Sequence, residues 1–376
     1  MNIFMSAGEI SGDMLGAGLA KALKRIAPGV KLTGIGGDYM RAAGVSLIDD
    51  ITALSAAGIV EPLVAIIPSL AAYGRIKRYF AAHPVDLVVL IDNQGFNLIL
   101  SSYCRKNGIP NVYYFPPHVG IWGEANADKL KATCDLIIAP FKFDYDVYKK
   151  HGCTAICEGH PFADIAPGKV RKISSKKITI GIMPGSRNQE IRELTGVFLD
   201  AAVKLHRLFG ERIQFRLPLA HARYRRAIEK AIQSRKDRSA LPLTIIEGEN
   251  AADDVYASAD AMILASGTAS LLAAVHGIPM VICYRTSALT YMIGKMVVRG
   301  QMIGMPNIML GRLAVPELIQ RDCTSDAIAA HISFWLNDPD AYRAVRDELA
   351  RVRGLLGKTG AVLRAAKAVI TCAKKK

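Results

Sequence analysis

The stretch ITIGIMPGSR, residues 178–187, joins a run of aliphatic residues to a glycine-containing turn. Its first six residues are rich in β-branched side chains and predict a buried strand. The amphipathic stretch that follows, Leu194–Phe209, predicts a helix. A strand that leads through a short turn into a helix is the repeating unit of parallel α/β sheets, so this stretch indicates an α/β fold.

Similar units occur on both sides of this stretch. Five strands are predicted before it, at residues 3–5, 31–34, 87–91, 112–115 and 136–139, and four after it, at residues 213–217, 243–246, 261–264 and 280–283. The short, polar and basic segment Gly168–Lys177 is the best candidate for a linker. We therefore predict two Rossmann-like domains, residues 1–168 and 176–337, and two helices in residues 340–376 that pack back on the first domain.

The composition limits the function classes. With 376 residues, 51% of them hydrophobic, the chain can form two cores. The net charge of +15 indicates an anionic partner such as nucleic acid, acidic phospholipid or a phosphorylated substrate. Because aromatic residues make up only 7% and no nucleic-acid-binding module is recognisable, we expect no nucleic-acid partner. The odd number of cysteines, seven, favours reduced thiols and a cytosolic location.

The longest apolar stretch, Ile51–Tyr73, is interrupted by Glu61 and two prolines, which argues against a membrane-spanning helix. Three basic residues follow it, at positions 75, 77 and 78. An apolar surface with a basic rim could lie in a bilayer interface and contact anionic headgroups. An ordinary core helix with a solvated basic end fits the same sequence equally well.

Polar turns follow several predicted strands, at the carboxyl ends where open α/β sheets bind ligands. In the first turn, SAGEISGD at residues 6–13, the glycines allow close approach to the backbone, and Ser11 or Asp13 could cap the next helix. Read as a site, the turn would bind an acceptor substrate or a phosphate through Glu9, Ser11, Gly12 and Asp13.

Two further turns carry single titratable residues. Asp92 follows the aliphatic strand at 87–91, and it either caps a helix or, if it faces a cleft, acts as a general base on an acceptor hydroxyl. His160 precedes a proline that holds it in extended geometry. It either hydrogen-bonds a phosphate in the acceptor site or is a buried histidine with satisfied hydrogen bonds.

The turn at 184–190 carries the strongest functional signal. Gly185 allows backbone N–H groups to approach phosphate oxygens, Ser186 adds a hydroxyl, and the Arg187 guanidinium can pair with a leaving diphosphate. The turn at 265–270 repeats this pattern with Ser266, Gly267 and Thr268 at a helix start. Neither turn has dinucleotide-binding or Walker spacing. We expect no cofactor and no required metal, because the Asp144-Tyr145-Asp146 pair lies in a lysine-rich helical pattern.

Taken in order, these turns resemble the lipid A disaccharide synthases, membrane-associated bacterial glycosyltransferases of the GT-B fold, in which two Rossmann-like domains with parallel sheets face each other across a cleft. The resemblance covers nearly the whole chain. It rests on SAGEISGD at 6–13, GIVE at 58–61, Ile91-Asp92 with Phe96-Asn97, GHP at 159–161, PGSR at 184–187 with Glu190, ASGTA at 265–269, Tyr284-Arg285, MPNI at 305–308, Gly311-Arg312 and PELIQ at 316–320.

The resemblance implies an inverting hexosyltransferase. Its donor would be UDP-2,3-diacylglucosamine and its acceptor 2,3-diacylglucosamine 1-phosphate (lipid X), and it would release UDP and a β-1,6-linked disaccharide. Asp92 would be the base. Arg187, Asn307 and Gln320, with Glu317 from the same motif, would bind UDP, and Lys129 would join the acceptor site. The resemblance also implies a peripheral position on the cytoplasmic side of the inner membrane and is compatible with a homodimer.

The sequence differs from the family pattern at three single positions and in one loop. Leu272 stands where a glutamate that binds ribose is usual, and Gly95 where a second aspartate is common. The loop Pro116–Gly123 keeps only part of the family motif, and Asn126 replaces a basic residue. Two other classes of function therefore stay open: a different GT-B UDP-sugar transferase or epimerase, and a non-catalytic paralogue that binds lipid or nucleotide.

Overall fold

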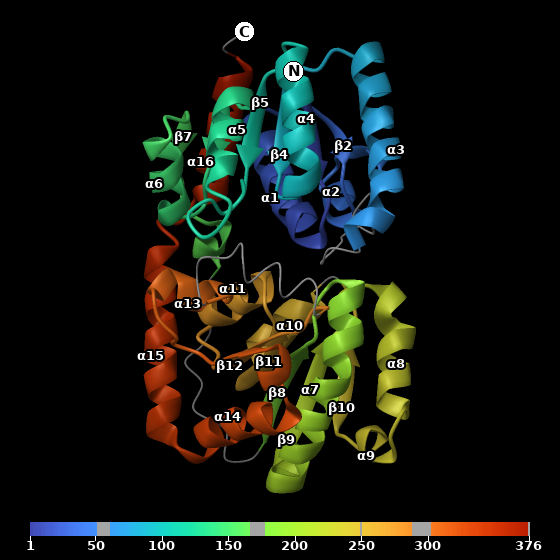
Figure 1. Ribbon diagram of the computed structural model, residues 1–376, viewed down its shortest axis with the longest axis vertical. Coiled ribbons are helices and arrows are strands. Elements are labelled where there is room, and N and C mark those ends of the chain that lie inside the picture. The colour runs from blue at the N-terminus through green and yellow to red at the C-terminus, as the bar shows by residue number, and fades with distance from the viewer. Residues whose placement is uncertain (51–60, 166–176, 249, 288–301, 375–376) are drawn as a thin grey trace. The chain divides into compact units, whose positions relative to one another are not determined.

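The structure is a computed structural model that describes residues 1–50, 61–165, 177–248, 250–287 and 302–374, without the side chains of residues 61–68. Within these residues the chain forms two compact units (Figure 1). The first comprises Met1–Asp164 and Leu356–Lys376, and the second comprises Ile165–Tyr291 and Gln301–Leu355. The GIVE motif, except the backbone of its last residue, and nearly all of the predicted linker lie outside the described residues, as does most of the apolar stretch Ile51–Tyr73.

The first unit is built on a seven-stranded parallel sheet in the order β3-β2-β1-β4-β5-β6-β7. The strands are β1 (Asn2–Ala7), β2 (Lys31–Ile35), β3 (Ser46–Asp49), β4 (Leu87–Ile91), β5 (Asn111–Tyr114), β6 (Leu136–Ile138) and β7 (Ala155–Ile156). Ala7 of β1 pairs with Ile91 of β4. The strand order reverses between these two strands, and such a reversal is where ligands bind in open α/β sheets.

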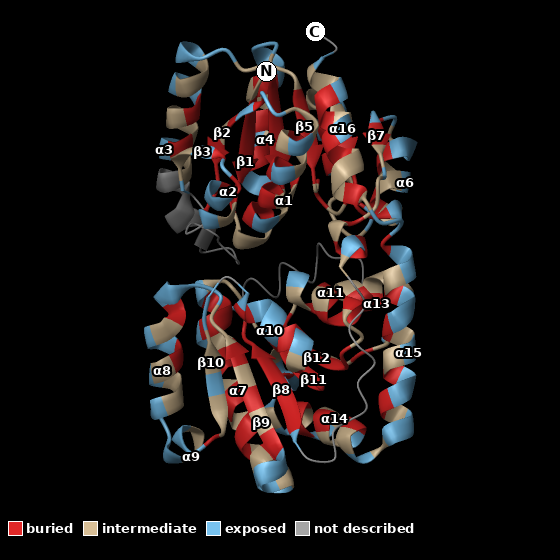
Figure 2. Cartoon of the chain, turned by 180° about the vertical axis from the view of Figure 1, so that it is seen from behind, coloured by how far each residue is buried: buried red, intermediate tan, exposed pale blue. Residues whose placement is uncertain are grey.

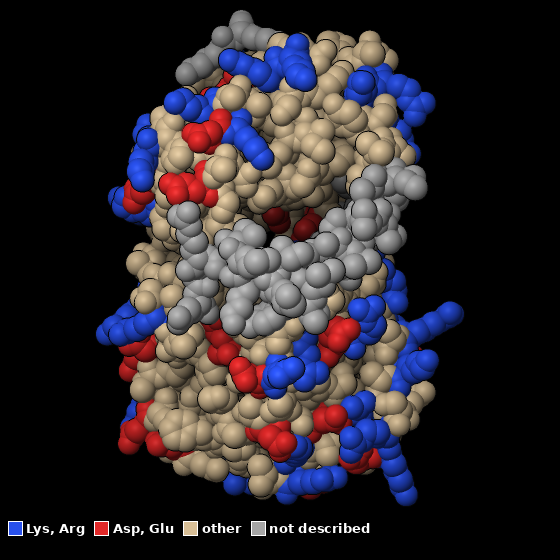
Figure 3. Space-filling model, in the orientation of Figure 1, with Lys and Arg blue, Asp and Glu red and all other residues tan. Residues whose placement is uncertain are grey.

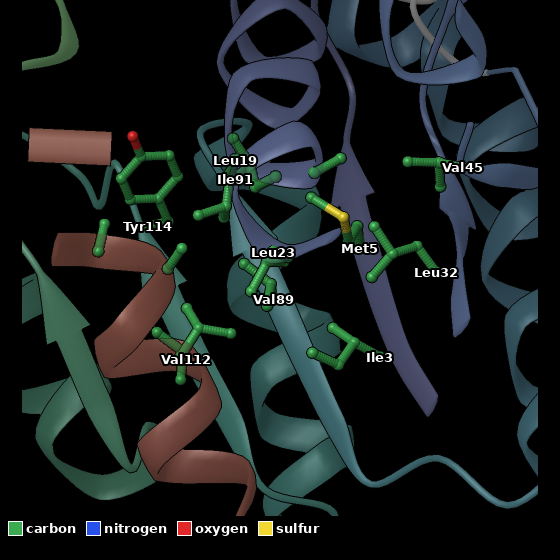
Figure 4. Packing of buried hydrophobic residues seen from close by; sticks show 14 of the residues in the cluster. Ile3, Met5, Leu19, Leu23, Leu32, Val45, Val89, Ile91, Val112 and Tyr114 are labelled. Atoms are coloured by element: carbon green, nitrogen blue, oxygen red, sulfur yellow. The ribbon is translucent and has the colours of Figure 1, made fainter. Parts of the chain in front are cut away.

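Helices cover both faces of this sheet. They are α1 (Ile10–Ile26), α2 (Asp38–Ala42), α3 (Glu61–Ala82), α4 (Gln94–Lys106), α5 (Ala125–Thr133), α6 (Lys142–Lys150) and α16 (Ala361–Ala373), with the 3-10 turn η2 (Pro161–Asp164). Side chains of β1 and β4 alternate between two cores. Met5 and Val89 pack with Leu19 and Leu23 of α1 (Figure 4), whereas Phe4 lies in the core on the opposite face. The sheet is therefore buried on both sides, as in a doubly wound fold.

The second unit has six parallel strands in the order β10-β9-β8-β11-β12-β13. The strands are β8 (Ile178–Met183), β9 (Ile213–Pro218), β10 (Leu243–Ile246), β11 (Ala261–Ala265), β12 (Met280–Tyr284) and β13 (Glu317–Ile319). The order reverses between β8 and β11, where Met183 pairs with Leu264. As Figure 2 shows, the strands are largely buried, while the helices present buried residues on one side and exposed residues on the other.

The helices of the second unit are α7 (Asn188–Phe209), α8 (Arg225–Gln233), α9 (Lys236–Ser239), α10 (Ala251–Ser258), α11 (Thr268–Val275), α13 (Met305–Leu310), α14 (Ser325–Asn337) and α15 (Pro339–Leu355). Three 3-10 turns join them: η3 (Gly210–Arg212), η4 (Ala222–Tyr224) and η5 (Gln320–Asp322). All seven cysteines lie in the described part of the chain and are free thiols.

The predicted α/β class is confirmed, and every strand predicted from the sequence is present. The sequence did not reveal β3, β7 and β13, which are short strands at the sheet edges. The prediction for the C-terminal helices was wrong for α15, which packs against α11, α13 and α14 of the second unit. Its apolar residues, such as Val345 and Leu349, are buried there. Only α16 packs on the first unit, against α1 (Figure 1).

Candidate functional site

The reversal point of the first sheet presents Asp92 on a strained turn. Asp92 and Asn93 have φ angles of 50° and 43°, a region that residues other than glycine rarely adopt. The Ser11 hydroxyl donates to Asp92 Oδ2 at 3.2 Å. A Cβ atom on Gly8 would lie 1.7 Å from the side-chain nitrogen Nδ2 of Asn93, so a larger residue at position 8 would force the Asn93 side chain to move. The structure thus brings the predicted turn at 6–13 against the predicted base.

A buried amide holds this strained turn in place. Asn97, which is 0% exposed, donates through Nδ2 to the carbonyl oxygens of Ile91 and Asp92 and accepts a hydrogen bond from the Ser6 hydroxyl. The Tyr113 hydroxyl also donates to the Asp92 carbonyl oxygen, at 2.8 Å. Two such backbone conformations cost about 1–3 kcal/mol each and persist only where their surroundings fix them, which is typical of functional sites.

The Asp13 carboxylate forms hydrogen bonds within the protein. It accepts hydrogen bonds from the backbone N–H groups of Gly37, Tyr39 and Met40, at 2.8, 2.9 and 3.0 Å. It therefore caps the N-terminus of α2, a helix other than its own. Burial raises the pKa of this carboxyl group, and the three backbone hydrogen bonds oppose that rise. Glu9 and Gly12 stay close to the site: Glu9 is the half-buried N-cap of α1, and a Cβ on Gly12 would lie 3.4 Å from the Asp92 Cβ.

His160 is buried, with 3% of its surface exposed, among the rings of Phe115, Phe141 and Phe162. Its Nδ1 accepts a hydrogen bond from the Phe162 N–H. Burial lowers the pKa of His160 to about 3, so the ring is neutral near pH 7. His160 is therefore a buried, neutral ring with a hydrogen bond at Nδ1, and its contact with a phosphate stays a prediction. Lys129, the other predicted acceptor contact, is exposed on α5.

At the reversal point of the second sheet, the turn after β8 starts helix α7. Arg187 is the N-cap of α7, and Gly185 has a φ of 117°. The carboxylate of Glu190, only 6% exposed, accepts the N–H groups of Ser186 and Arg187 at 2.9 and 3.2 Å. The same carboxylate pairs with the Arg187 guanidinium at 3.1 Å. The turn thus binds an anion in the way predicted for a phosphate, but the anion is a side chain of the protein itself.

The neighbouring turn after β11 starts helix α11. Gly267 is its N-cap with a φ of 144°, and Thr268 is exposed beside it. The Ser266 hydroxyl donates to the Ile303 carbonyl oxygen at 2.9 Å. Leu272 is half-buried in the second turn of α11. The two predicted donor turns, 184–187 and 266–268, therefore follow the two strands at which the sheet order reverses, and this is a ligand position of the fold.

The three other predicted donor residues are used within the protein. Asn307 is fully buried: its amide donates to Val315 O and Glu317 Oε1, and its oxygen accepts from two backbone N–H groups. Glu317 also accepts the N–H groups of Ile303 and Gly304. Gln320 exchanges two hydrogen bonds with the backbone of Thr286. These side chains fix the loops beside the site, so their geometry indicates positioning residues.

Sequence reasoning did not identify two polar residues of these sites as anchors. Glu190 lies three residues after the N-cap Arg187, which is the capping-box spacing, so the pattern itself could have shown its role. Asn97 follows no comparable capping pattern, and one of its partners, Ser6, is 91 positions away. Within the described residues, no group of three or more metal-ligating side chains occurs, and no helix is both long and apolar enough to cross a membrane.

The chain is similar to known proteins both in its fold and in its sequence. Solved structures with the same arrangement include UDP-GlcNAc 2-epimerase from Neisseria meningitidis, bound to UDP-GlcNAc (TM-score 0.67, 14% identity, 100% of both chains), and MurG from Acinetobacter baumannii (TM-score 0.58, 15% identity, 98% and 99% of the two chains). At this level of identity they show the fold alone, which is the predicted GT-B fold of Rossmann-like domains.

Relatives of similar length are much closer in sequence. The lipid-A-disaccharide synthase of Geobacter metallireducens is 36% identical over 100% of this chain and 98% of its own length. That of Pseudomonas paraeruginosa is 36% identical over 90% of both chains. The family description "Lipid-A-disaccharide synthetase" matches residues 3–366. The chain therefore belongs to the lipid-A-disaccharide synthetase family.

Proposed function

We propose that this protein is an inverting glycosyltransferase that condenses UDP-2,3-diacylglucosamine with 2,3-diacylglucosamine 1-phosphate. The products are a β-1,6-linked disaccharide 1-phosphate and UDP. The observation that carries this assignment is family membership over residues 3–366, together with a polar site at the reversal point of each sheet. One site offers a carboxylate and the other an arginine at a helix start, the two groups that such a transfer needs.

In this proposal the second unit holds the donor. The backbone of Gly185 and Ser186 approaches the diphosphate, and Arg187 neutralises the negative charge that develops as the C1–O bond to UDP breaks. Because the Glu190 carboxylate accepts the N–H groups of Ser186 and Arg187, a bound diphosphate would displace this carboxylate or share the N–H groups with it. Ser266, Gly267 and Thr268 line the neighbouring turn. Asn307, Glu317 and Gln320 keep the adjoining loops in position.

The first unit activates the acceptor. Asp92 accepts the proton of the 6-hydroxyl group while that oxygen forms the new bond to C1 of the donor sugar from the face opposite UDP, so the anomeric configuration inverts. Ser11, hydrogen-bonded to one oxygen of Asp92, orients the carboxylate. Glu9 and Gly12 shape the same turn. Helix α7 and its N-cap stabilise the departing UDP, which leaves with the electron pair of the broken bond.

Both substrates carry two acyl chains, so we propose that the protein works as a peripheral protein on the cytoplasmic side of the inner membrane. The net charge of +15 favours binding to anionic lipid surfaces. On the face shown in Figure 3, Lys and Arg side chains lie on the described surface of both units, with Asp and Glu among them. Sedimentation with anionic and with neutral vesicles tests this location, and light scattering tests whether the protein is a homodimer.

Release of UDP tests the proposed reaction. Purified protein is incubated with the diacylated donor, with and without the 1-phosphate acceptor. UDP release only in the presence of both substrates supports the proposal. Conversion of the donor without any acceptor would instead indicate a UDP-sugar epimerase. Binding of UDP by calorimetry without any turnover would indicate a non-catalytic paralogue.

A further inference from the structure

The loop after β5 carries an imidazole that a buried carboxylate holds in place. His118 Nδ1 lies 2.7 Å from Asp144 Oδ2, and the other Asp144 oxygen accepts the Gly120 N–H at 2.9 Å. Asp144 lies in the first turn of α6, and only 1% of its side chain is exposed. Because an ionised carboxylate can only accept hydrogen bonds, His118 donates from Nδ1, and Nε2 is the ring nitrogen left to contact a ligand.

The surroundings fix the ring but leave part of it accessible. Aromatic rings of Trp122, Phe141 and Phe143 lie 5.6 to 6.4 Å from the imidazole, centroid to centroid. The Tyr148 hydroxyl donates to the Pro117 carbonyl oxygen and so anchors the loop just before His118. The His118 side chain nevertheless keeps 28% of its surface exposed. A histidine anchored by a buried acid and open on its other side is arranged for contact with a ligand.

This imidazole belongs to the same end of the sheet as Asp92. Strands β4 and β5 are neighbours, and the Asp92 N–H donates to the Tyr114 carbonyl oxygen. Burial by itself lowers the pKa of His118, but the hydrogen bond and charge of Asp144, and then the charge of Asp92, raise it above the ordinary value. Burial, and then the charge of His118, lower the pKa of His160 in the segment after β7, so that His160 is neutral near pH 7. The groups facing His118 thus favour its cationic form.

We infer that the His118 imidazolium binds the phosphate monoester of the acceptor, with Asp144 as its positioning residue. This inference rests on the proposed function, which gives the acceptor a 1-phosphate. A phosphate that enters near the Asp92 carboxylate needs a positive charge to offset the repulsion between the two anions. A charge-assisted hydrogen bond from Nε2 to a phosphate oxygen supplies it.

The test compares two acceptors in three variants. In His118→Gln the charge is lost, and in Asp144→Asn the anchor is weakened. His151→Gln is the matched control, because His151 also pairs with carboxylates, those of Glu124 and Asp128, but lies at the opposite end of α6 from Asp144. The KM for the 1-phosphate acceptor should rise roughly 10- to 100-fold in His118→Gln, which corresponds to the loss of one charged hydrogen bond. The KM for the donor, and the KM for the same acceptor without its phosphate, should stay within about threefold of the wild type.

The pH profile separates a positioning role of Asp144 from a merely structural one. Since binding requires the imidazolium, the KM for the phosphorylated acceptor should rise as the pH passes above the pKa of His118. Asp144→Asn should move that rise to lower pH, because the group that raises the pKa is weakened. An equal loss with both acceptors, or a pH profile that Asp144→Asn leaves in place, would overturn the inference.

Direct binding measurements distinguish a failure of the phosphate site from a failure of the proposed reaction. Calorimetry with glucosamine 1-phosphate and with inorganic phosphate measures affinity without turnover. If the wild type releases no UDP but binds glucosamine 1-phosphate through His118, the proposed reaction fails and the phosphate site stands. If the wild type turns over and His118→Gln binds the probe as tightly as the wild type, the phosphate site fails and the reaction stands.

Discussion

Replacing Asp92 with asparagine should abolish most of the activity and leave the fold intact. The structure indicates that this substitution changes the chemistry of the side chain without disturbing the turn. Residue 92 has a φ of 50°, and asparagine tolerates this left-handed conformation at least as well as aspartate does. The backbone contacts that hold the turn, from Asn97 and Tyr113, go to the main-chain carbonyl of residue 92 and do not depend on its side chain. The Ser11 hydroxyl can donate to the amide oxygen instead of the carboxylate.

The size of the loss follows from the role of the base. A positioned general base contributes a factor of about 100 to 10,000, and an amide cannot take the proton. We therefore expect kcat to fall by that factor, which is roughly 3 to 5 kcal/mol in the activation free energy. The side chain is half-buried and its carboxylate accepts the Ser11 hydroxyl, so the free energy of unfolding should change by less than about 1 kcal/mol.

The assay is UDP release under saturating donor and acceptor, with urea unfolding of the same preparations. Asp38→Asn is the control, because it removes a carboxylate of the same unit whose side chain is 82% exposed. It should keep full activity. If Asp92→Asn retained kcat within about threefold of the wild type, Asp92 would not be the base. If it lost activity and stability together, the loss would be structural.

Three further predictions concern single side chains. Arg187→Ala should lower kcat by about 100- to 1,000-fold. Arg192→Ala is the control and should leave kcat unchanged, because the Arg192 side chain is 69% exposed on the same helix. Similar turnover of the two variants would show that Arg187 is not part of the donor site. Asp13→Asn should lower the free energy of unfolding by about 2–4 kcal/mol, because the asparagine amide places a donor against the backbone N–H groups that the carboxylate caps. An unchanged urea midpoint would contradict this capping role. His160, with its pKa lowered from 6.5 to about 3, stays neutral in the folded state while the unfolded chain takes up a proton, so stability should fall by up to about 1.4 kcal/mol per pH unit between these two values as the pH decreases. His160→Phe should remove that part of the slope in denaturant titrations at pH 4.5 and 7, and an unchanged slope would argue against a neutral buried ring.

Local patterns made most of the fold predictable. The central strands are runs of aliphatic residues bounded by turns, so their sequence identifies them without knowledge of their partners. The edge strands β3 and β13 have only four and three residues, and they exist because a neighbouring strand offers free hydrogen-bonding groups. Helix α15 shows what a local pattern cannot predict. Its amphipathic pattern predicted a helix, but the pattern does not specify which apolar surface it covers.

For the candidate sites too, local patterns predict the positions of the turns but not the contacts of each side chain. The turns at 6–13, 92–97, 184–187 and 265–270 could be found because they follow predicted strands. What each side chain does depends on partners far along the chain: Asp13 caps a helix 25 residues later, and Asn97 bonds a residue 91 positions earlier. His118 and Asp144 are 26 residues apart, and no local pattern connects them. Long-range hydrogen bonds are therefore what the structure adds.

Joint measurement of UDP and the lipid product is the most direct test of the proposed transfer reaction. The wild type is incubated with UDP-2,3-diacylglucosamine and 2,3-diacylglucosamine 1-phosphate, and UDP and the lipid product are quantified in the same sample by chromatography and mass spectrometry, with the linkage assigned by NMR. An inverting transfer between these two substrates should give equal amounts of UDP and a β-1,6-linked disaccharide 1-phosphate. UDP without disaccharide, an α linkage, or no product from folded protein that binds both substrates would contradict it.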